Sequence, residues 1–177
     1  MKLVVRTGLL ALALVAATAL SARAQSASLQ GDLLKDWTAM KEQITKLADA
    51  MPEDKFAFKS TPAQRSFGEH VMHIAGANMM LIKALGAKAA PPAIDMKATT
   101  KAGMLKALGE SFDYGTAAIK EQTDTTMGAT VQGPPFMGAS TRARIVWATL
   151  GHTWDTYGQM VVYLRLNGIV PPASRQP

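Results

Sequence analysis

Apolar side chains recur every three to four residues in four long stretches of the chain, which is the spacing of an amphipathic helix. These stretches cover residues 28–50, 61–86, 100–125 and 140–167. The segments between them show no β-hairpin signal and no internal repeat. Four amphipathic helices of this length in a single domain predict an all-α fold, a four-helix bundle.

The stretches are bounded by residues typical of helix caps and turns. The second stretch has the clearest start signal, in which Thr61 is the capping residue, Pro62 takes the first helical position and Gln64 lies three residues after the cap. The segment 86–99 has two prolines and no sustained periodicity, so we expect a long crossover between the second and third helices. The segment 127–140 is rich in glycine and proline and predicts another connection.

The first 24 residues have the pattern of a secretory signal peptide. Lys2 and Arg6 form a basic start, an apolar run follows over residues 9–20, and Ala22-Arg23-Ala24 is a cleavage site of small residues. We expect residues 1–24 to be removed and residues 25–177 to form one secreted or periplasmic domain. No later segment is long and apolar enough to predict stable insertion in a membrane.

Protein recovered from its native host is expected to begin at or within a few residues of Gln25, because the basic start, the apolar run and the cleavage site all coincide. Intact-mass spectrometry checks this expectation. A mature chain that still carries Met1 would exclude cleavage of this leader.

Composition removes several classes of function. The chain has no cysteine, which excludes disulfides and thiol chemistry on the protein itself. Lys and Arg number 19 against 13 Asp and Glu, but the leader holds three of the basic residues and no acidic one. The mature domain is therefore only slightly basic, and it has no basic patch interleaved with aromatic residues. We expect no nucleic-acid partner.

The three histidines of the chain, His70, His73 and His152, all fall inside predicted helices. His70 and His73 are three residues apart, so they share one side of the second helix. Metal sites in bundles are built from inward side chains on facing helices, and imidazole is a common ligand of zinc, nickel and iron. Two interpretations stay open: a shared metal site, or buried histidines that bond to backbone or carboxylate groups.

Two strings, MPEDKFAFKSTPAQRSFGEHVMHIAGAN and HTWDTYGQMVVYLRLNGIVPPAS, resemble the DinB/YfiT-like family of four-helix-bundle metalloenzymes. The resemblance covers essentially the whole mature chain, and YLRLNGIVPPAS is its most specific part. It implies an up-down-down-up bundle with a long crossover after the second helix. It also implies a divalent metal such as zinc or nickel, held by three histidines, and activity as a thiol S-transferase or a hydrolase.

Carried onto this chain, the three ligand positions of the family fall on His73, His152 and Thr156. A neutral threonine hydroxyl is a poor ligand for such an ion, so we expect the metal to be weakly bound or absent. Asp155, as third ligand or catalytic base, and His70 are alternative groups to complete the site. Two functions stay open: a metal-dependent hydrolase or transferase with an incomplete site, and a metal-free module that binds an unknown small molecule or serves as structure.

Other conspicuous side chains are interpreted as packing. Methionines next to the histidines are more typical of a core than of a copper site; these are Met72, Met79 and Met80. Aromatic residues recur at helical spacing in the fourth stretch and predict either bundle core or the face of a homodimer; these are Trp147, Trp154, Tyr157 and Tyr163.

Overall fold

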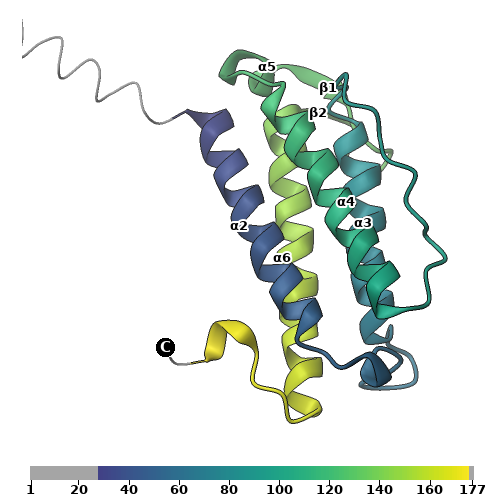
Figure 1. The fold of residues 1–177 in the computed structure, drawn as a ribbon. Coiled ribbons are helices and arrows are strands. Elements are labelled where there is room, and N and C mark those ends of the chain that lie inside the picture. Colours follow the sequence, from purple (N-terminus) through teal and green to yellow (C-terminus); the bar gives the residue numbers. More distant parts are fainter. Residues whose placement is uncertain (1–27, 176–177) are drawn as a thin grey trace, which may run out of the picture.

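The computed structural model describes residues 28–175, and the expected signal peptide over residues 1–24 lies outside the described residues. Four long helices form the body of the molecule (Figure 1). They are α2 (Leu29–Asp49), α3 (Phe67–Lys83), α4 (Lys101–Lys120) and α6 (Arg142–Leu166). The predicted all-α four-helix bundle is confirmed.

Short elements occupy the connections between the long helices. They are the 3-10 helices η1 (Glu53–Lys55) and η2 (Pro172–Ser174), the helix α5 (Asp124–Gly128), and the strands β1 (Thr130–Gln132) and β2 (Ala139–Thr141).

The helices have an up-down-down-up arrangement. Figure 1 shows α2 and α6 running in one direction and α3 and α4 in the other, with the segment after α3 returning along the bundle to the start of α4. Both α2 and α3 pack against α4 and α6. The expected topology and crossover are therefore confirmed, and α3 and α6, which carry the histidines, are antiparallel neighbours.

Trp37 of α2 is a fully buried residue of the core. Its Nε1 donates a hydrogen bond of 2.9 Å to the carbonyl oxygen of Phe112, and the two rings pack with centroids 4.9 Å apart. Gly115, one turn after Phe112 on α4, lets the indole lie directly against the helix backbone. Large, fully buried side chains extend this core along the bundle; they include Met40, Ile44, Phe67, Ile74, Leu108 and Ile119.

Helix α3 begins later than predicted. The Ser66 side chain accepts a hydrogen bond from Glu69 N, and the Glu69 carboxylate accepts one from Ser66 N, so these two residues form a capping box. Residues 61–64 form a turn instead, in which Gln64 N donates to Thr61 O. The predicted start at Thr61 is wrong, because a competing cap with a charged partner lies a few residues downstream.

The connection from α4 to α6 also differs from the prediction. Helix α4 ends at Lys120, and Thr123 caps the separate short helix α5. Strands β1 and β2 then pair antiparallel, with Val131 opposite Ser140. Gly138 has φ +60° at the end of the hairpin loop, a conformation that glycine adopts without strain. This unpredicted hairpin holds loop 133–138 in place.

Two of the aromatic residues on α6 are outside the core. Trp147 and Trp154 are 68% and 47% exposed, whereas Tyr163 is buried. The core interpretation is therefore wrong for the two tryptophans, and a homodimer through this face stays a prediction. No helix over residues 28–175 has the length and apolar character needed to cross a membrane.

Candidate functional site

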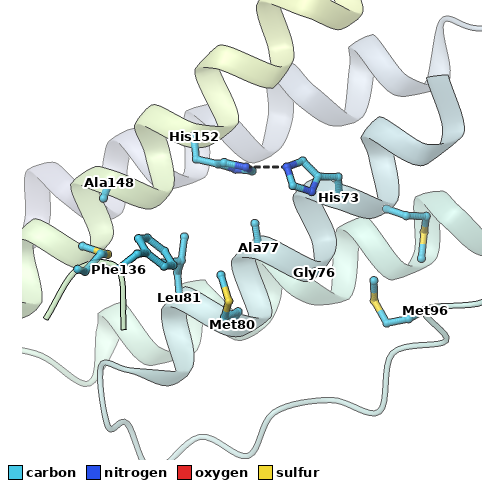
Figure 2. A pocket seen from close by; sticks show the side chains of 11 residues that line it. His73, Gly76, Ala77, Met80, Leu81, Met96, Phe136, Ala148 and His152 are labelled. Carbon is cyan, nitrogen blue, oxygen red and sulfur yellow. Dashed lines mark hydrogen bonds between the residues drawn. The ribbon is translucent and has the colours of Figure 1, made fainter. Parts of the chain in front are cut away.

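Helices α3 and α6 bring His73 and His152 together. Their Nε2 atoms lie 2.9 Å apart and share a hydrogen bond, and the ring centroids are 4.7 Å apart (Figure 2). The predicted convergence of these two side chains is thus confirmed, although 79 residues separate them in the sequence. A hydrogen bond between two imidazole nitrogens needs one bare nitrogen and one N–H, so the two Nε2 atoms satisfy each other in this arrangement.

The surroundings of the pair favour neutral rings. Burial lowers the pKa of His73, and the charge of Arg65 and the neighbouring His152 lower it further. Burial also lowers the pKa of His152; the Asp155 carboxylate opposes this effect and Arg65 adds to it. At neutral pH both imidazoles are therefore uncharged, which is the form that binds either a metal or a neutral hydrogen-bonding partner.

Thr156 faces the bundle interior one turn after His152, but its hydroxyl is already used. The side chain is only 2% exposed, and Oγ1 donates a hydrogen bond of 3.0 Å to the carbonyl oxygen of His152. This bond ties the hydroxyl to its own helix. The third ligand position of the family is thus occupied by a group that is both weak as a ligand and engaged elsewhere.

The two alternative groups do not complete the set either. The Asp155 side chain is exposed, and its Oδ2 accepts a hydrogen bond of 2.9 Å from Gln159 Nε2. His70 is 1% exposed, and its ring packs edge-on against Tyr163 with centroids 5.1 Å apart. Burial, followed by the charge of Arg65, lowers the pKa of His70. Asp155 thus acts on the pair only through its charge, and His70 is part of the core.

The residues present do not fit the three-ligand metal site that the resemblance implies. Within residues 28–175 no group of three or more His, Cys, Asp or Glu side chains is placed to hold a metal ion. His73 and His152 offer two imidazole ligands, and Zn²⁺ sites in proteins have at least three protein ligands. The pair supplies two of the three ligands that the resemblance implies.

The histidine pair lies at the edge of an apolar pocket with a cavity volume of about 510 Å³. Figure 2 shows the pocket between α3 and α6, with Ala77, Met80 and Leu81 on the α3 side and Ala148 on the α6 side. Met96, from the crossover, and Phe136, from the hairpin loop, complete its wall. Phe136, Met80 and Met96 are 73%, 51% and 49% exposed, so large apolar side chains are left facing this hollow.

Sequence reasoning identified the two histidines but missed the pocket. Met72 and Met80, interpreted as packing, both line it, as do Met96, Phe136 and Met137 from two connections. The available signal was a set of large apolar residues inside segments otherwise rich in glycine, proline and alanine, where exposed apolar groups are unexpected.

The fold agrees with comparisons to known proteins. The model of the DinB superfamily matches residues 36–160, and the chain belongs to this superfamily. A search of curated proteins finds no match.

Two solved structures share the fold. The chain is similar to a DinB-like protein from Bacillus cereus, with a TM-score of 0.70 and 20% identity, over 79% of this chain and 93% of that one. It is also similar to the DinB-like protein YjoA from Bacillus subtilis, with a TM-score of 0.65 and 15% identity, over 82% of this chain and 99% of that one.

Proposed function

We propose that this protein is an exported member of the DinB superfamily that binds an apolar small molecule in the pocket beside His73 and His152. In this proposal the pair holds a divalent ion weakly or not at all. The export part is supported by the leader pattern of residues 1–24.

One observation carries the proposal: the two histidines are bonded to each other, not to a third ligand, at the edge of a preformed apolar pocket. Pockets for small molecules have volumes of roughly 300–1,000 Å³ and combine an apolar lining with a few polar groups. This pocket has that size and that composition. The metal-dependent hydrolase or transferase activity implied by the resemblance is not part of the proposal, because Thr156 and Asp155 do not supply the missing ligand.

The binding function is tested with N-phenyl-1-naphthylamine, an apolar dye whose fluorescence rises in apolar surroundings. The dye is expected to bind the wild type, and Ala77→Leu is expected to weaken binding at least tenfold. Ala77 is half-buried on α3 and lines the pocket, so a leucine there fills space that the ligand needs. Fluorescence titration measures both affinities.

Ala39→Leu is the matched control. Ala39 lies on α2 and lines a different groove, beside Trp147 and Trp154. The same substitution there is expected to leave dye binding unchanged. Binding that is lost with Ala39→Leu and kept with Ala77→Leu would place the dye on the tryptophan face and contradict the proposal.

A further inference from the structure

The pocket has a single polar end. Of the side chains described as lining it, only those of His73 and His152 carry nitrogen or oxygen; the others are aliphatic, aromatic or thioether groups, or glycine. Among these lining side chains, a molecule in the pocket therefore has two imidazoles as its only polar neighbours. The hydrogen-bond donors and acceptors of the two rings decide which class of ligand is recognised.

The positions of the protons follow from burial. His152 Nδ1 is buried and has no hydrogen-bond partner among the residues that the structure describes. His73 Nδ1 is not among these buried atoms without a partner. A buried N–H without an acceptor is rarer and less favourable than a buried acceptor without a donor. The nitrogen without a proton is therefore placed at His152 Nδ1. His152 Nε2–H then donates to His73 Nε2, and the proton of His73 is on Nδ1.

In this tautomer the pair presents one donor, His73 Nδ1–H, at the polar end of the pocket. The side chains next to the pair are small, because Gly76 and Ala77 follow His73 on α3 and Ala148 precedes His152 on α6. Met96 lies close to Gly76, and Met80, Phe136 and Met137 add the other bulky apolar groups of the wall. A flat ligand can thus approach the donor while its apolar body lies among these groups.

We propose that the pocket selects an apolar molecule that carries one hydrogen-bond acceptor, of the class of aromatic ketones, and that His73 Nδ1–H binds this acceptor. The inference rests on the proposed function, since it names the ligand class of the same pocket. His152 acts through His73: its Nε2–H fixes the tautomer and the orientation of the ring, so it is a positioning residue.

The test compares 2-acetylnaphthalene with 2-isopropenylnaphthalene as competitors of the naphthylamine dye. The two molecules have the same shape, but the alkene has no acceptor. The measured quantity is selectivity, the ratio of the two affinities, because the ketone and the alkene differ in their solubility in water. His73→Leu is expected to lower the selectivity for the ketone about fivefold, the effect of one hydrogen bond. His73→Gln returns an N–H donor and is expected to restore part of the selectivity.

Ala39→Leu serves again as the control and is expected to keep the wild-type selectivity. Thermal unfolding followed by circular dichroism confirms that each variant is folded. If His73→Leu does not fold, His73→Gln still tests the role of the donor. Equal selectivity in the wild type, His73→Leu and His73→Gln, with dye binding still weakened at least tenfold by Ala77→Leu, overturns the acceptor inference and leaves the proposed function standing. Failure of both naphthalenes and the dye to bind the wild type overturns both.

Discussion

Replacing Gly115 with alanine is expected to destabilise the protein by about 2–3 kcal/mol, in the range of overpacked cores. A Cβ at this position would lie 2.6 Å from Trp37 Cε2 and closer still to Cζ2. The indole has no room to retreat, because it is fully buried and its Nε1 donates to Phe112 O. Either the ring rotates and breaks that bond, or α2 and α4 separate. Urea unfolding measures the loss.

Gly109→Ala on the same helix is the matched control. A Cβ at Gly109 would meet nothing within 4 Å, so the substitution only removes the backbone freedom of glycine. It is expected to stabilise the protein by about 0.5–1 kcal/mol. If Gly115→Ala proved as stable as Gly109→Ala, the packing of Trp37 against the backbone of α4 would be refuted.

The helices of the bundle could be predicted because each buries a stripe of side chains spaced at three to four residues. Trp37, Met40, Ile44 and Leu47 on α2 follow this spacing, and all four are fully buried. The stripe does not fix where a helix begins. At α3 two capping signals lie close together, and the downstream one prevails, where Phe67 N and Gly68 N also donate to the carbonyls of Phe58 and Phe56.

The β1–β2 hairpin had no strong local signal. Its strands have three residues each, too few for an alternating pattern to stand out. Pairing is fixed by the loop, where Met137 N and Gly138 N both donate to Pro134 O and Gly133 N donates to Gly138 O. Such a loop is evident only once these backbone groups are placed.

The histidine pair was predictable in part. Three histidines confined to helices suggested a shared site, and the family resemblance selected His73 and His152 from them. The pocket was not predictable, since its wall combines α3 and α6 with Met96 and Phe136 from two connections. Apolar residues in connections have no periodicity, so only the folded chain shows which of them meet.

Restoring a third ligand at position 156 is expected to create a metal site that the wild type lacks. Residues 152 and 156 are four apart on α6 and share one face of the helix, and Thr156 is buried. Thr156→His adds an imidazole where the family resemblance places one. Thr156→Cys is the second variant, because cysteine is close to threonine in size and its thiolate binds zinc. Each is expected to bind Zn²⁺ at least tenfold more tightly than the wild type, a difference of about 1.4 kcal/mol.

Two controls separate this site from others. Thr156→Val keeps the shape of threonine without adding a ligand, so it is expected to bind zinc no better than the wild type. His73→Ala, combined with each position-156 variant, is expected to abolish the gain. A gain that survives the loss of His73 belongs to a different site.

Isothermal titration of the wild type and the Thr156→His protein with Zn²⁺ tests most directly whether His73 and His152 form a metal-free pair beside a ligand pocket. Weak or no binding of Zn²⁺ to the wild type is expected, with binding at least tenfold tighter to the variant. Equally tight binding to both proteins would contradict this expectation, because Asp155 or His70 would then have completed a metal site in the natural chain.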